Sequence, residues 1–61
     1  MDYLSLNTIT LVSIINTKLR DFYPDLASLV EDLDINLDEL NKKMNQDNFY
    51  YDIKTNQFIK R

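Results

Sequence analysis

The fold of this chain is decided by residues 29–44, which read LVEDLDINLDELNKKM. Their apolar spacing is that of two short helices joined by a tight turn, with Ile35 placed beneath the turn. The pattern predicts a helix-turn-helix-like unit. A compact three-helix core without that specific geometry has a similar spacing and is an equal alternative. The apolar positions are Leu29, Val30, Leu33, Ile35, Leu40 and Met44.

Capping signals set the limits of these two helices. The chain contains no glycine, so left-handed positions fall to Asn or Asp, and Asp34 suits the end of a helix over about residues 25–33. Asn36 suits the N-cap of a helix over about residues 37–46. Leu37 is expected on the inner face of that helix.

A further helix is predicted before them, over about residues 8–22. Asn7 is its expected N-cap, and the Tyr23-Pro24 pair ends it, because the residue before proline avoids the α region. Three- and four-residue spacing gives this helix one apolar stripe. The stripe consists of Leu11, Val12, Ile15, Leu19 and Phe22.

The C-terminal segment, about residues 49–59, reads as a β-hairpin. Phe49, Tyr51 and Ile53 alternate with polar or exposed positions, which predicts that all three point inward. Residues 54–56 form the expected turn, with Asn56 at a positive φ. Lys60 and Arg61 are expected to be a frayed, solvated end. The predicted fold is mainly α: one domain over residues 1–61, a three-helix, helix-turn-helix-like unit with a wing-like two-stranded hairpin.

Composition limits the chemistry. The 61 residues include no cysteine and no histidine, which removes disulfides, thiol chemistry and the usual general base near neutral pH. We therefore expect no enzyme activity and no cofactor or metal. The oxygen-bearing residues 32–38 alternate as in an EF-hand loop, but Leu37 and Lys43 stand where that loop needs glycine and glutamate. The N-terminal stretch lacks the basic region of a signal peptide, so we expect a cytoplasmic protein without membrane contact.

Charge argues against nucleic acid as the favoured partner. The net charge is −3, and residues 25–47 carry seven acids against two bases. Asp38 and Glu39 occupy the first turn of the helix that would read base edges in a helix-turn-helix protein. The leading interpretation is a non-enzymatic module that binds protein, with self-association through residues 8–22 as one form, because Leu4, Leu6 and Ile14 exceed the needs of a small core. The alternative is a winged helix-turn-helix DNA-binding protein that uses Lys18, Arg20, Lys42, Lys43 and Lys54.

Two further residues are candidates for specific roles. Asn16 is a poor helix former inside a predicted helix. Solvent exposure is the simpler explanation, and the sharper hypothesis is that Asn16 or Arg20 hydrogen-bonds the connection between the first two helices or a partner, with Asn16 in a structural role. Tyr50 is expected to point away from the core, where it either contacts a partner or covers apolar surface. The candidate residues are therefore Asn16, Lys18, Arg20, Lys42, Lys43, Tyr50, Lys54 and Asn56.

Residues spread along nearly the whole chain carry a family resemblance. The chain resembles a family of small bacterial proteins known as domain of unknown function 4250. The resemblance rests on Asn16-Thr17-Lys18-Leu19-Arg20-Asp21, Tyr23, Leu26, Leu29, Tyr51-Asp52 and Asn56-Gln57-Phe58. The family often has cysteine where Val30 stands and Gly-Tyr where Asn48-Phe49 stand. The resemblance implies a bacterial cytoplasmic protein and brings no activity with it.

Overall fold

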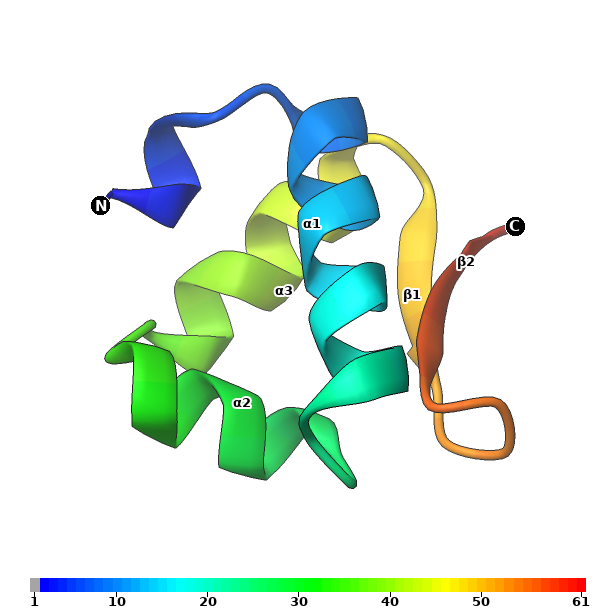
Figure 1. Ribbon diagram of the computed structural model, residues 1–61. Coiled ribbons are helices and arrows are strands. Elements are labelled where there is room, and N and C mark those ends of the chain that lie inside the picture. Colours follow the sequence, from blue (N-terminus) through cyan, green and yellow to red (C-terminus); the bar gives the residue numbers. More distant parts are fainter. Residues whose placement is uncertain (1) are drawn as a thin grey trace.

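A computed structural model describes residues 2–61 and contains helices followed by a hairpin (Figure 1). A short 3-10 helix, η1, precedes three α-helices and two strands. The elements are η1 (Tyr3–Ser5), α1 (Thr8–Asp21), α2 (Leu26–Leu33), α3 (Leu37–Gln46), β1 (Phe49–Asp52) and β2 (Gln57–Lys60). The predicted three helices and C-terminal hairpin are confirmed, with bounds that differ by one residue at most; η1 was not predicted.

Short polar side chains cap each α-helix, and the caps of α1 and α3 are those that the sequence predicts. The side-chain oxygen of Asn7 accepts from the backbone N–H of Thr10, and that of Asn36 accepts from Glu39, both at 3.0 Å. Asp25 caps α2 in the same way, through Ser28. Each cap satisfies a backbone N–H that has no partner within its helix.

Three residues adopt left-handed backbone between elements, and none of them is glycine. Asp34 (φ 55°) ends α2, Asn48 (φ 66°) separates α3 from β1, and Asn56 (φ 55°) closes the hairpin turn. Asn and Asp tolerate this region because their short side chains form local hydrogen bonds. Asp34 and Asn56 were predicted in this role, whereas Asn48 was missed.

The core lies where α1, α2, α3 and the inner face of the hairpin meet. Its buried residues are Leu11, Ile15, Leu19, Leu26, Leu29, Val30, Leu40, Met44, Phe49 and Phe58. Leu4 and Leu6 pack against this core, as does Ile35 beneath the turn between α2 and α3. Leu4 and Leu6 are therefore not surplus apolar residues, which removes part of the argument for self-association through α1.

Three apolar side chains predicted to face inward lie outside. Phe22 is 72% exposed, because α1 ends at Asp21 and Tyr23 packs against the core in its place. Ile53 is 82% exposed, because the antiparallel ladder stops at the Asp52–Gln57 pair and leaves Ile53 in the turn. Leu37, at the start of α3, is 38% exposed.

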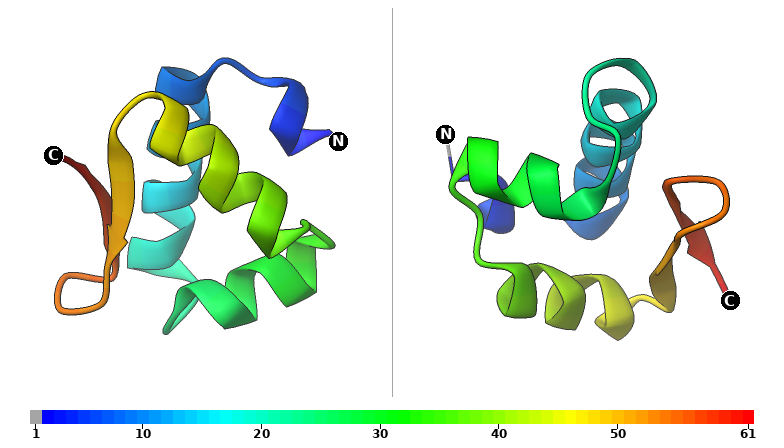
Figure 2. Two further views of the ribbon diagram at one scale, coloured as in Figure 1. Left: turned by 180° about the vertical axis from the view of Figure 1, so that it is seen from behind. Right: turned by 90° about the horizontal axis from the view of Figure 1, so that it is seen from below.

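The hairpin lies along one side of the helices, with β2 beside α1 and β1 following the C-terminal end of α3 (Figure 2). Its register pairs Phe49 with Lys60 and Tyr51 with Phe58. Two-stranded hairpins are marginally stable alone, so the contact with α1 matters.

Asn16 makes that contact from the middle of α1, so its side-chain partner is β2 and not the predicted connection between the first two helices. Its side-chain Nδ2 donates to the backbone oxygen of Phe58 at 3.0 Å, and the backbone N–H of Phe58 donates to Asn16 Oδ1 at 2.7 Å. One side-chain amide thus bonds both backbone groups of a β2 residue, as a neighbouring strand would. Gln57 adds a bond from its Nε2 to the backbone oxygen of Asn16 at 3.0 Å.

Asn56 fastens the turn of the hairpin to the end of α1. Its Nδ2 donates to the backbone oxygens of Leu19 and Tyr23, both at 3.1 Å, and its Oδ1 accepts from the Tyr51 hydroxyl at 2.5 Å. Carbonyls in the last turn of a helix lack intrahelical partners, and Asn56 supplies one. Asn16 therefore binds β2 to α1, and Asn56 binds the hairpin turn to the C-terminal end of the same helix.

Replacing Asn16 by alanine should destabilise the domain, because both backbone groups of Phe58 lose their partner. Leaving such groups unpaired costs about 1–3 kcal/mol. In a domain of this size each kcal/mol lowers Tm by about 4–8 °C. Thermal unfolding followed by circular dichroism measures the change. Asn45→Ala, which removes an exposed amide from α3, is the matched control. An unchanged Tm for Asn16→Ala would contradict the docking role.

Acid should weaken the start of α2. The backbone N–H of Ser28, followed by the Ser28 side chain, lowers the pKa of the Asp25 carboxyl below its ordinary value. A lowered folded-state pKa means that this contribution is present above the unfolded pKa of about 3.9 and is lost as pH falls through the folded value. Asp25→Asn keeps a capping oxygen that does not titrate. We expect Asp25→Asn to lose less Tm than the wild type between pH 5 and pH 2.5, roughly the range of carboxyl titration, with Asp47→Asn as the charge-matched control. Parallel curves of Tm against pH for the wild type and Asp25→Asn would contradict this prediction.

Candidate functional site

The candidate residues chosen from the sequence do not form one cluster. Asn16 and Asn56 are half-buried and bonded between α1 and the hairpin, so their observed contacts are internal. Lys18 and Arg20 lie on α1, Lys42 and Lys43 on α3, and Lys54 in the hairpin turn. The remaining candidate, Tyr50, lies on β1 and is 37% exposed, in agreement with the prediction that it points outward.

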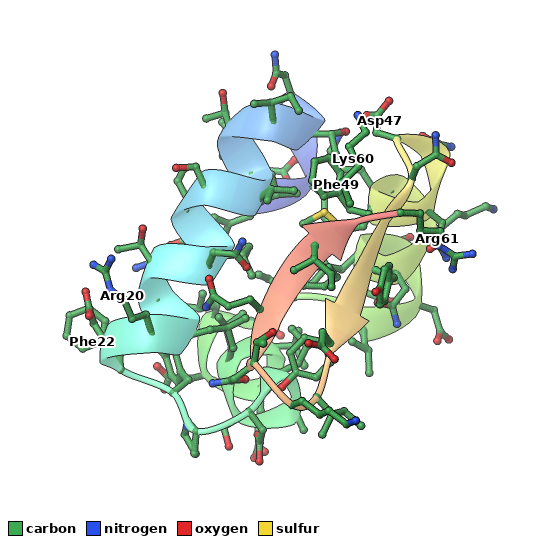
Figure 3. The ribbon with its side chains drawn as sticks, turned by 90° about the vertical axis from the view of Figure 1, so that its right-hand side faces the viewer. Arg20, Phe22, Asp47, Phe49, Lys60 and Arg61 are labelled. Carbon is green, nitrogen blue, oxygen red and sulfur yellow. The ribbon has the colours of Figure 1, made fainter. Side chains whose placement is uncertain are left out.

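Arg20 is already engaged by a neighbour. Its Nε and one terminal nitrogen donate to the two carboxylate oxygens of Asp21, at 2.9 and 3.0 Å. The hydrogen bond and the opposite charge raise the pKa of Arg20, and the hydrogen bond from Arg20 lowers the pKa of Asp21. Figure 3 shows Arg20 and Phe22 at the end of α1, away from Lys60 and Arg61 at the end of β2. The cations on these elements are therefore separated.

The two C-terminal cations are ordered against aromatic rings, which corrects the prediction of a frayed end. Lys60 Nζ lies 5.3 Å from the centroid of Phe49, and Arg61 Cζ lies 5.4 Å from that of Tyr50. The backbone N–H of Arg61 also donates to the oxygen of Asn48 at 2.8 Å. The sequence did hold a signal for this. Because the turn fixes the register of the hairpin, extending the predicted strand past residue 59 places Lys60 and Arg61 beside Phe49 and Tyr50.

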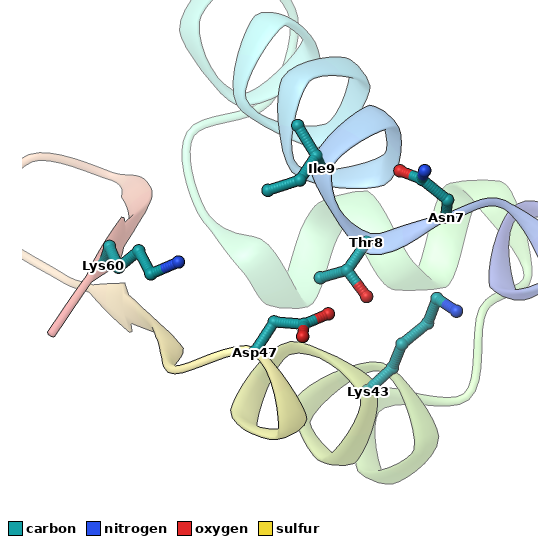
Figure 4. A pocket seen from close by; sticks show the side chains of 6 residues that line it. All are labelled: Asn7, Thr8, Ile9, Lys43, Asp47 and Lys60. Carbon is teal, nitrogen blue, oxygen red and sulfur yellow. The ribbon is translucent and has the colours of Figure 1, made fainter.

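One surface hollow, of about 380 Å³, lies between the start of α1, the end of α3 and the end of β2 (Figure 4). It brings together residues that are far apart in the sequence: Asn7, Thr8, Ile9, Lys43, Asp47 and Lys60. The amide oxygen of Asn7 is occupied by the cap of α1. The other polar groups that line this hollow include two ammonium groups, a hydroxyl and the carboxylate of Asp47.

A second hollow, of about 560 Å³, is acidic. Tyr23, Ser28, Glu31 and Asp32 line it. The Tyr23 hydroxyl donates to the Asp32 carboxylate, and this hydrogen bond is the main cause that raises the pKa of Tyr23. The carboxylates of Glu31 and Asp32 suit a cationic side chain better than a phosphate.

The face that would read DNA in a helix-turn-helix protein is acidic in the folded chain too. Asp38 and Glu39 are exposed in the first turn of α3, and Asp34 is exposed in the three-residue connection from α2. Lys42 is exposed one turn further along α3, and Lys43 is half-buried. Phosphate contacts need cations at the start of this helix, where the protein has carboxylates instead.

Within residues 2–61, no three His, Cys, Asp or Glu side chains are grouped so as to hold a metal ion. None of the helices in the same range combines the length and apolar character needed to cross a bilayer.

The comparisons with known proteins give a family without a stated activity. The family model described as "Domain of unknown function (DUF4250)" matches residues 5–58. No curated protein and no solved structure matches the chain. The matched range includes Asn16, Asn56 and Phe58, and so covers the contacts that dock the hairpin. The resemblance seen in the sequence is thus confirmed over nearly the whole chain, which belongs to the DUF4250 family.

Proposed function

We propose that this domain is a non-enzymatic, cytoplasmic module that binds protein. The observation that carries the proposal is the exposed acidic surface formed by Asp34, Asp38 and Glu39, at the place where a helix-turn-helix fold meets its target. A surface of this charge repels phosphates and suits a partner with basic groups.

An enzyme is not proposed, because the residue types available offer no activated nucleophile. The chain has neither histidine nor cysteine. The two hollows are lined by carboxylates, ammonium groups, hydroxyls and an amide that already serves as a cap. General acid–base catalysis near neutral pH relies on groups that titrate there, most often histidine.

DNA binding is the alternative, and the order of elements favours it. A helix, a three-residue turn, a second helix and then a hairpin follow one another as in a winged helix-turn-helix protein. In this alternative Lys42, Lys43 and Lys54 contact phosphates, together with Lys18 and Arg20 on α1. The acidic first turn of α3 opposes this alternative.

Fluorescence anisotropy with a mixed-sequence DNA duplex separates the two. We expect no binding at micromolar protein, at low salt or at moderate salt, because carboxylates lie at the reading face. Phosphate contacts would instead give binding that weakens steeply with salt. Salt-sensitive micromolar binding that Lys42→Glu abolishes and Lys18→Glu retains would overturn the proposal and place the DNA on α3.

A further inference from the structure

Hydrogen bonding across the hairpin fixes which backbone groups face outward. Along two antiparallel strands, facing residues alternate between two kinds. In one kind the two residues exchange backbone hydrogen bonds, and in the other their N–H and C=O groups point away from the partner strand. Both backbone groups of Phe58 bond to Asn16, so Phe58 and its partner Tyr51 are a pair of the second kind. The bond from Arg61 to Asn48 fits the same alternation. The N–H and C=O groups of Tyr51 and Phe49 therefore face the outer edge of β1.

These β1 groups have no hydrogen-bond partner among residues 2–61, whereas on the opposite edge both backbone groups of Phe58 are bonded. Asn16 closes the edge of β2 at Phe58. Residues 49–52 read FYYD, so the edge of β1 carries neither proline nor lysine, two residues that commonly protect edge strands. The hairpin is thus a two-stranded sheet with one edge open for pairing.

We propose that β1 pairs antiparallel with β1 of a second copy, about a two-fold axis at Tyr50. This inference rests on the proposed protein-binding function and adds a second contact surface, separate from the acidic one. Phe49 of each copy then exchanges backbone hydrogen bonds with Tyr51 of the other. The two hairpins become one continuous sheet with strand order β2–β1–β1–β2, in which both inner strands are paired on both sides.

The sequence of β1 is complementary to itself in this arrangement. Phe49 faces Tyr51 and Tyr50 faces Tyr50, and such aromatic cross-strand pairs stabilise sheets. Asp52 of one copy faces Asn48 of the other, where the Arg61 backbone is held. The long Arg61 side chain thereby comes within reach of a carboxylate of opposite charge, and no like charges face each other along residues 49–52.

The size of the domain gives self-pairing a physical benefit. A 61-residue chain without cysteine has no disulfide to add to its small core. Sheets with more than two strands are stable where a lone hairpin is marginal. An isologous contact also closes after one pairing, so it forms a dimer and no filament.

Sedimentation equilibrium over a range of concentrations tests the proposal. We expect the wild type to dimerise, and Tyr50→Lys to raise the dissociation constant by about tenfold or more, because two ammonium groups then face each other. Phe22→Lys makes the same change on α1 and should leave the dimer intact. A wild type that is monomeric at millimolar concentration, or a dimer unaffected by Tyr50→Lys, would overturn the proposal.

Cysteine cross-linking locates the contact independently. The natural chain has no cysteine, so Tyr50→Cys introduces a single thiol. Facing residues of a non-hydrogen-bonded antiparallel pair have Cα atoms about 4.5 Å apart, within the span of a disulfide. We expect Tyr50→Cys to oxidise to a dimer at least about tenfold faster than Phe22→Cys at low protein concentration, and equal rates would refute the edge contact. Neither result bears on DNA, so the anisotropy experiment reports separately on the proposed function.

Discussion

The structure depends on the side-chain amide of Asn16, which binds both backbone groups of Phe58. A two-stranded hairpin has little stability of its own, and this amide gives β2 the hydrogen bonds of a missing strand. With the strand fixed, Phe58 and Phe49 enter the core beside Ile15 and Met44. Asn56 fixes the other end of the same contact by bonding carbonyls at the end of α1. Helix and hairpin therefore form one unit.

The same amide explains why the two edges of the hairpin differ. Asn16 is in the middle of α1, so β2 faces the helix and its edge is satisfied there. Strand β1 follows α3 directly through Asp47 and the left-handed Asn48, and its outward backbone groups meet no protein partner in residues 2–61. Because only the β1 edge has unbonded backbone groups at these positions, a further strand would pair there. The acidic start of α3 lies elsewhere on the surface and is unsuited to phosphate.

Two of the candidate residues, Asn16 and Asn56, have contacts within the fold, and so does Gln57. Each of these polar side chains bonds the backbone of another element. A small domain without glycine or cysteine has few other means to join a hairpin to a helix. The family model covers these positions. The surface left for a partner lies elsewhere, on β1 and around the connection from α2 to α3.

The sequence by itself determined the elements. Periodic apolar residues located three helices, caps at Asn7 and Asn36 set their starts, and Asp34 and Asn56 took the left-handed turns that glycine usually fills, because these are local effects of backbone and neighbouring side chain. Only the tertiary structure decided that Asn16 meets Phe58, that Phe22 and Ile53 lie outside, and that Lys60 and Arg61 cover aromatic rings. Contacts across some forty residues of sequence depend on how the elements pack, which periodicity does not encode.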